Sequence, residues 1–153
     1  GFNSLPREEL SKSPMLIIWT TPPSSSVLKK ALDSVSPKTV VLFAEDPIIQ
    51  TKRSILQALL GLLKHLRDTG KSYDPALFSQ SIGQTPALIE LGLTWFHEHG
   101  DYDLSHLKTN QILAGGGSPL PGFAVVDNKF NLLLHEISSY RGYYKNAKKE
   151  YLL

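Results

Sequence analysis

Possible metal ligands gather in one short stretch of the sequence, where imidazole and carboxylate groups of the kind that bind divalent cations lie close together. The spacing matches no zinc signature such as H-E-x-x-H. Histidines two positions apart on a helix also point about 200° away from each other. We therefore interpret the cluster as a solvated helix end, and a small metal-dependent hydrolase is the weakest alternative function. The residues concerned are His97, His99, Asp101, Asp103 and His106.

Two other kinds of catalytic or cofactor site lack the residues that they need. The turn at residues 20–24 reads Thr-Thr-Pro-Pro-Ser, with neither the glycines nor the lysine of a phosphate-binding loop. Its prolines also lack the N–H donors that a phosphate needs. The Gly-rich residues 115–118 have no following lysine and favour a flexible linker, while a G-x-S-x-G elbow and cysteine are absent from the chain. We predict no catalytic residue, no metal and no cofactor in this chain.

Basic and aromatic residues offer a different chemistry, because they gather in two places: near residues 64–71 and in the tyrosine-rich tail. Cations neutralise phosphates and aromatic rings stack on bases, a mixture typical of proteins that bind single-stranded nucleic acid. A helix that packs its tyrosines on the core and exposes its lysines to water would show the same pattern. The candidate nucleic-acid-binding residues are Lys64, Arg67, Lys71, Arg141, Tyr143, Tyr144, Lys145, Lys148 and Lys149.

The overall composition sets limits on these hypotheses. The 153 residues suffice for one compact domain or two small ones. A net charge of +2 is small, so binding of nucleic acid would depend on local clusters of charge. The absence of cysteine excludes disulfides and suits a reducing compartment, for which we predict the cytoplasm. The sequence has no apolar run near the ~20 residues that cross a membrane, and we predict no membrane contact.

The first part of the chain predicts one βαβ unit over residues 15–50. Residues 15–19 and 39–43 are apolar runs that indicate buried parallel strands. Between them, residues 24–35 have helical apolar spacing behind a serine cap, so a right-handed, Rossmann-like crossover is expected. Gly1 stands where an initiator methionine would, and residues 1–14 are polar, which predicts a linker inside a longer protein.

The middle of the chain, residues 51–114, has the order of a winged-helix segment. A long helix over residues 55–66 is followed by two more helices, capped by Asp74 and Thr85, and then by extended stretches at residues 102–104 and 111–114. In such folds the third helix normally enters the major groove of DNA. Here that helix carries carboxylates and no Lys or Arg, so we do not expect it to read bases.

The end of the chain predicts a β-hairpin and a helical tail. A Gly/Pro-rich loop covers residues 115–122. Residues 123–126 and 130–135 are apolar runs on either side of Asp-Asn-Lys, which indicates a hairpin, and a basic, tyrosine-rich helix completes residues 123–153. The predicted fold class is therefore α/β: a small Rossmann-like βαβ unit joined to a winged-helix (helix-turn-helix) segment, with a β-hairpin and a C-terminal helix.

The order of these pieces resembles the C-terminal region of RecJ-type single-stranded-DNA-specific exonucleases, in particular the extended cyanobacterial forms. The resemblance covers about residues 15–100. It rests on the strand followed by Pro-Pro-Ser, on the strand P-K-T-V-V-L-F and on T-P-A-L-I-E-L-G-L-T-W-F-H-E-H-G. It implies a parent hydrolase that degrades single-stranded DNA from 5′ to 3′ in DNA repair and recombination, using manganese or magnesium. The Asp-His-His motif of that family's catalytic domain is absent here.

The resemblance thus implies a non-catalytic C-terminal module, attached to the rest of the parent chain, that assists in binding DNA or a partner. One hypothesis is weak binding of single-stranded DNA through the basic tail. The alternative is a protein-interaction module that docks single-strand binding protein, using Trp95 and Phe96 if the fold exposes them.

Overall fold

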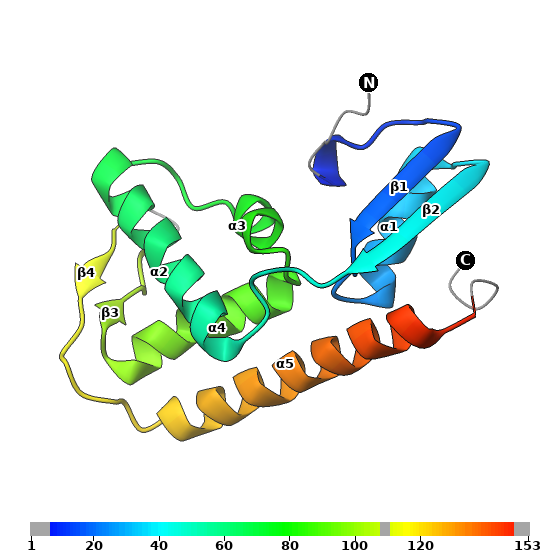
Figure 1. Ribbon diagram of the computed structural model, residues 1–153. Helices are drawn as coiled ribbons and strands as arrows, with labels where there is room; N and C mark the ends of the chain where they lie inside the picture. Colours follow the sequence, from blue (N-terminus) through cyan, green and yellow to red (C-terminus); the bar gives the residue numbers. More distant parts are fainter. Residues whose placement is uncertain (1–6, 108–110, 149–153) are drawn as a thin grey trace. The chain divides into compact units, whose positions relative to one another are not determined.

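The computed structural model describes residues 7–107 and 111–148 and divides the chain into two compact units (Figure 1). One comprises Gly1–Ile48 and Ile137–Leu153 and is called the strand unit below. The other, Ile49–Glu136, is called the helical unit. Each unit is described by itself.

The strand unit contains the predicted β-α-β order, after a short 3₁₀ helix, η1 (Arg7–Glu9). Strands β1 and β2 are parallel, with Met15 opposite Thr39 and Ile18 opposite Leu42. The side chain of Ser24 caps the intervening helix by accepting the N–H of Val27 at 3.3 Å. The elements are β1 (Met15–Thr20), α1 (Ser25–Val35) and β2 (Thr39–Glu45).

The prediction that both strands are buried is wrong. Within β1 only Leu16 is buried, while Trp19 is 60% and Phe43 of β2 is 49% exposed. The rings of Trp19 and Phe43 stack with their centroids 4.4 Å apart. Side chains alternate between the faces of a strand, and in Figure 1 helix α1 lies against this two-stranded sheet. The exposed rings show that an apolar run need not be buried on both faces of its strand.

The helical unit contains three helices followed by a small antiparallel sheet, in the predicted order. Tyr102 pairs with Ala114, and Asp103 pairs with Leu113. The prediction of extended stretches at residues 102–104 and 111–114 is thus confirmed in shorter form. The elements are α2 (Lys52–Thr69), α3 (Pro75–Ile82), α4 (Pro86–His99), β3 (Tyr102–Asp103) and β4 (Leu113–Ala114).

Local capping explains where these helices begin and end. Asp74 and Thr85 accept backbone N–H groups at the starts of α3 and α4, and a proline follows each as the first helical residue. Thr51 and Ser54 form a capping box at the start of α2. The three helices end in glycines with left-handed backbone: Gly70, Gly83 and Gly100.

Side chains from α2, α3, α4 and the helix that contains Phe130 fill the core of the helical unit. Leu59 of α2, Ile89 of α4 and Phe130 are 0% exposed. A Cβ atom on Gly92 would lie 2.3 Å from the Leu59 side chain and 3.3 Å from that of Phe130. The absence of a side chain at this position therefore allows α4 to approach its neighbours closely.

The predicted β-hairpin at residues 123–135 is wrong, because these residues form the first half of helix α5 (Phe123–Asn146). Phe130, Ile137 and Tyr144 recur every seventh residue, about two helical turns, and are 0%, 2% and 2% exposed. That stripe stabilises a helix over its whole length. Although α5 has 24 residues, neither it nor any other helix in the described part of the chain is apolar enough to cross a membrane.

The Gly/Pro-rich loop at residues 115–122 is not a free linker. Leu120 donates its N–H to the carbonyl of Glu98 at 2.7 Å, and Gly117 donates to that of Gly100 at 2.9 Å. A Cβ atom on Gly100 would lie 2.2 Å from the carbonyl oxygen of Ser118. The loop therefore packs directly on the C-terminal end of α4.

Candidate functional site

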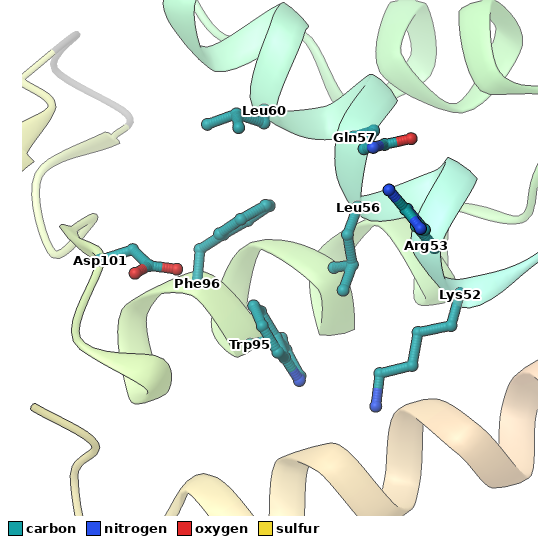
Figure 2. A pocket seen from close by; sticks show the side chains of 8 residues that line it. All are labelled: Lys52, Arg53, Leu56, Gln57, Leu60, Trp95, Phe96 and Asp101. Carbon is teal, nitrogen blue, oxygen red and sulfur yellow. The ribbon is translucent and has the colours of Figure 1, made fainter.

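An open groove runs beside α2 on the helical unit, and we call it the α2 groove (Figure 2). Its two parts have volumes of about 540 Å³ each. The two parts adjoin each other, because Leu60, Phe96 and Asp101 line both. The first part is further lined by Lys52, Arg53, Leu56, Gln57 and Trp95, and the second by Arg67, Tyr102 and residues 112–114. The volume of each part lies in the range of ordinary ligand sites.

The sequence of α2 explains the chemistry of the groove. Arg53, Leu56, Leu60, Lys64 and Arg67 are three or four residues apart, so they share one face of the helix. This face differs from the buried stripe that packs into the core. It is apolar in the middle and basic at both ends.

Helix α4 contributes two rings to the groove. Docking of a partner on these rings requires that the fold expose them. Trp95 is partly exposed, but Phe96 is only 5% exposed. In Figure 2 the ring of Phe96 extends from α4 toward the side of Leu60, whereas the nitrogen of Trp95 lies on the side of Lys52. His99 stacks on Trp95 with ring centroids 4.7 Å apart and an angle of 8° between the planes. The indole is thus held in place before any ligand arrives.

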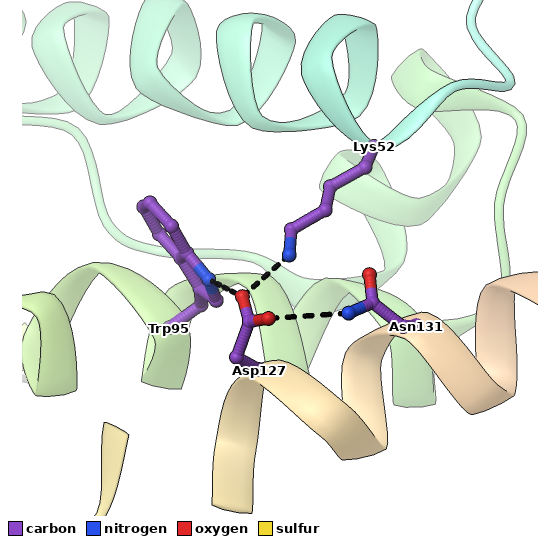
Figure 3. Close-up of polar contacts among 4 residues, drawn as sticks. All are labelled: Lys52, Trp95, Asp127 and Asn131. Carbon is purple, nitrogen blue, oxygen red and sulfur yellow. Dashed lines mark hydrogen bonds and ion pairs between the residues drawn. The ribbon is translucent and has the colours of Figure 1, made fainter. Parts of the chain in front are cut away.

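A carboxylate of α5 fixes the same indole from its nitrogen (Figure 3). Asp127 accepts the Nε1–H of Trp95 at 2.6 Å, a hydrogen bond from Lys52 Nζ, and one from Asn131 Nδ2 at 3.1 Å. The hydrogen bond from Lys52, followed by that from Trp95, holds the pKa of Asp127 below its usual value. Asp127 pairs with Lys52. The neighbouring Arg53, the other cation at the start of α2, pairs with no carboxylate among the described residues.

The candidate nucleic-acid residues of the helical unit are accessible. Lys64, Arg67 and Lys71 are exposed at and just beyond the C-terminal end of α2. Arg67 pairs with its neighbour Asp68 at 3.1 Å, and both side chains are more than half exposed. These cations are therefore close together on a surface that a ligand can reach.

The candidates in the tail differ in accessibility. Arg141 is 3% and Tyr144 is 2% exposed. Burial lowers the pKa of Arg141, and burial raises the pKa of Tyr144 to about 12. These two side chains present almost no surface to a ligand, which agrees with the alternative that the tail packs its tyrosine on the core.

The remaining tail candidates lie at the surface. Tyr143 is 53% exposed, and Lys148 is exposed. Lys145 pairs with Asp46 at 2.6 Å. Lys149 lies outside the described residues. Binding of single-stranded DNA by the tail stays a prediction.

The histidine and aspartate cluster divides into two separate pairs. His97 Nδ1 accepts the N–H of Leu104 at 3.3 Å and lies 3.7 Å from Asp103 Oδ1. His99 Nδ1 lies 3.0 Å from Asp101 Oδ2. Hydrogen bonds from Ser105 lower the pKa of Asp103. Within residues 7–107 and 111–148 no three such groups come together in a metal-binding arrangement.

Sequence reasoning missed the groove and the Asp127 centre. The spacing of Arg53, Leu56 and Leu60 is visible in the sequence and indicates a second face of α2. The contacts of Asp127 come from residues 75 and 32 positions away, which no local pattern reveals.

Comparisons of the chain with protein-family models, with curated proteins and with solved structures find no match.

Proposed function

We propose that this chain is a non-catalytic accessory module of a RecJ-type single-stranded-DNA exonuclease that docks a partner protein in the α2 groove. The order of a β-α-β unit, three helices and a small antiparallel sheet supports the proposal, since it suits the Rossmann-like and winged-helix pieces of that resemblance. The manganese or magnesium chemistry would belong to the rest of the parent chain. The module would act in the cytoplasm, in DNA repair and recombination.

The observation that carries the proposal is the pair of rings on the groove floor. Aromatic side chains in well-packed pockets supply most of the energy of many protein interfaces. Here Trp95 is held by Asp127 and His99, so little conformational entropy is lost on binding. Leu56 and Leu60 extend the apolar floor. The partner that the resemblance implies is single-strand binding protein.

Titration of the chain with single-strand binding protein, followed by calorimetry, tests the proposal. Leu60→Glu places a charge on the apolar floor and should weaken binding by about tenfold or more. Leu77→Glu is the matched control, because Leu77 is 55% exposed on α3 and does not line the groove. It should bind like the unchanged chain.

Two results would refute docking of this partner at this site. One is no binding at low salt, and the other is equal binding by the Leu60→Glu variant and the unchanged chain. Circular dichroism checks that each variant is folded. Leu56→Ser provides a second, milder change on the same floor if Leu60→Glu does not fold.

Binding of single-stranded DNA is the second candidate function, favoured by the exposed cations at the end of α2. Lys64→Ala, Arg67→Ala and Lys71→Ala together should abolish most binding of a labelled oligonucleotide and reduce its salt dependence. Replacing Lys29, Lys30 and Lys38 by alanine changes the charge equally on the strand unit and serves as the control. If the unchanged chain binds no oligonucleotide at low salt, this function is excluded.

A further inference from the structure

We infer that the α2 groove binds an acidic amphipathic helix of a partner protein, laid along α2 with its apolar residues between two basic ends. This inference rests on the proposed docking function and specifies the chemistry of the docked segment. It needs no particular partner.

The length of the groove face fits a short helix. Arg53 and Arg67 are fourteen residues apart on α2, which corresponds to about 21 Å at 1.5 Å per residue. A ligand helix of about four turns spans the same distance. Its apolar residues at positions i, i+3, i+4 and i+7 would face Leu56, Leu60 and the two rings of α4, as in other helix-in-groove complexes.

The charges along α2 favour an acidic ligand. Lys52 is already paired with Asp127, which leaves Arg53, Lys64 and Arg67 against a single carboxylate of α2, Asp68. The pair between Arg67 and Asp68 is 52% and 64% exposed, and exposed pairs of this kind contribute only about 0–1 kcal/mol, so a ligand carboxylate can replace Asp68. The groove's own carboxylate, Asp101, lies 3.0 Å from His99. Glutamates near both ends of the ligand helix would therefore find Arg53 at one end and Arg67 with Lys64 at the other.

The same contacts disfavour a nucleic acid in this groove. Base stacking needs a free ring face, but His99 covers one face of Trp95 at 4.7 Å and Lys52 lies 5.8 Å from the ring centre. Phe96 is 5% exposed. The floor between the basic ends is apolar and gives no partner to the phosphates of a strand.

A designed peptide tests the inference directly. The probe is an end-capped helix of about fourteen residues with leucines at i, i+3, i+4 and i+7 and glutamates in its first and last turns. A second peptide carries lysines in place of the glutamates. Titration in a Trp19→Phe background leaves Trp95 as the only tryptophan reporter. The acidic peptide should bind at least about tenfold more tightly than the basic one, with the difference reduced by salt.

Charge reversal on the protein should exchange this preference. Arg53→Glu with Arg67→Glu should weaken the acidic peptide by about tenfold or more and strengthen the basic peptide. Lys29→Glu with Lys30→Glu makes the same change of net charge on α1 and should leave both affinities unchanged. A structural defect would weaken both peptides, whereas the exchange of preference requires direct contact.

Three results would overturn the inference. The first is equal affinity for the acidic and the basic peptide. The second is binding of the acidic peptide that is undiminished after charge reversal of Arg53 and Arg67. The third is the absence of peptide binding together with binding of a thymidine oligonucleotide, or of phosphatidylglycerol vesicles, that the charge reversal weakens. If single-strand binding protein docks in the groove while the acidic peptide does not bind, only the inference fails. If the peptide binds but that protein does not, only the proposed partner fails.

Discussion

The two units of this chain differ in how deeply their largest apolar side chains are buried. In the helical unit, side chains such as Leu59, Ile89 and Phe130 are 0% exposed. In the strand unit, Trp19 and Phe43 stack on each other but remain 60% and 49% exposed. The difference follows from architecture, because α2, α3, α4 and the first half of α5 all contribute to the core of the helical unit, whereas the strand unit is built on a sheet of only two strands.

The two units also differ in how well their exposed surfaces could bind a ligand selectively. The exposed rings of the strand unit are apolar, but no described ring contact or hydrogen bond fixes Trp19 apart from its contact with Phe43. The groove of the helical unit combines an apolar floor with charges, and Trp95 is fixed there from two sides. Fixed side chains and paired charges are what distinguish a selective surface from one that is merely apolar. Each unit contains one tryptophan, so single-tryptophan variants report on the two units separately.

The largest expected difference between the units comes from removing one phenylalanine from each. Phe130→Ala should lower the free energy of unfolding by about 3–5 kcal/mol, because it leaves a cavity in the closed core. Phe43→Ala removes a ring that is already half exposed and should cost less than about 1 kcal/mol. Urea unfolding followed by tryptophan fluorescence measures both. Equal losses would show that the strand unit is as tightly packed as the helical unit.

Replacing a glycine by alanine should change the free energy of unfolding in opposite directions in the two units. Gly92→Ala should destabilise the helical unit by about 1–3 kcal/mol, because its Cβ would meet Leu59 at 2.3 Å. Gly142, in the part of α5 that belongs to the strand unit, has nothing within 4 Å of its would-be Cβ. Gly142→Ala should therefore stabilise by up to about 1 kcal/mol through helix propensity. Thermal melts of the two variants test the signs, and stabilisation by Gly92→Ala would contradict the close packing.

The Asp127 centre should make the helical unit sensitive to acid. The pKa of Asp127 is lower in the folded chain than in the unfolded chain, where it is near 4. The charged carboxylate therefore stabilises the fold at pH values above about 4, and this stabilisation is lost as the pH falls through the lowered pKa of the folded state. Asp127→Asn should cost about 1 kcal/mol at neutral pH and nothing in strong acid. Urea unfolding at several pH values, with Asp33→Asn on α1 as control, measures this. A cost independent of pH would exclude a charged role for Asp127.

The smallest effect is expected at the surface pair of the strand unit. Lys145→Ala removes the ion pair with Asp46, which is partly exposed on both sides, and should cost no more than about 1 kcal/mol. The cost should shrink further at high salt. Unfolding at low and high salt measures it. A larger, salt-independent loss would show that the strand unit depends on this pair for its packing.

Local signals in the sequence were sufficient wherever a few neighbouring residues decide the structure. Ser24, Asp74 and Thr85 cap helices at the positions predicted, and Gly70 and Gly100 end them. The parallel pairing of the two strands also agrees with the prediction. Capping and helical periodicity act within one or two turns, so the sequence alone contains enough information.

Prediction failed where the outcome depended on distant partners. Residues 123–135 contain two short apolar runs that suit either a hairpin or a helix. The helix is stabilised by burial of Phe130 and by the contacts of Asp127 with Lys52 and Trp95. Apolar runs in β1 and β2 also indicated burial on both faces. Whether a second layer covers a sheet is decided by other parts of a fold, not by the strands themselves.

The sequence by itself thus determined helices α1 to α4, their caps, the parallel strand pair and the basic and apolar face of α2. Only the tertiary structure decided which of these residues form a site. It buried Arg141 and Tyr144, placed Trp95 beside Leu56 in one groove, and joined Lys52, Trp95 and Asp127 across three helices. The physical reason is that helix formation depends on nearby residues, whereas a groove depends on which helices pack together.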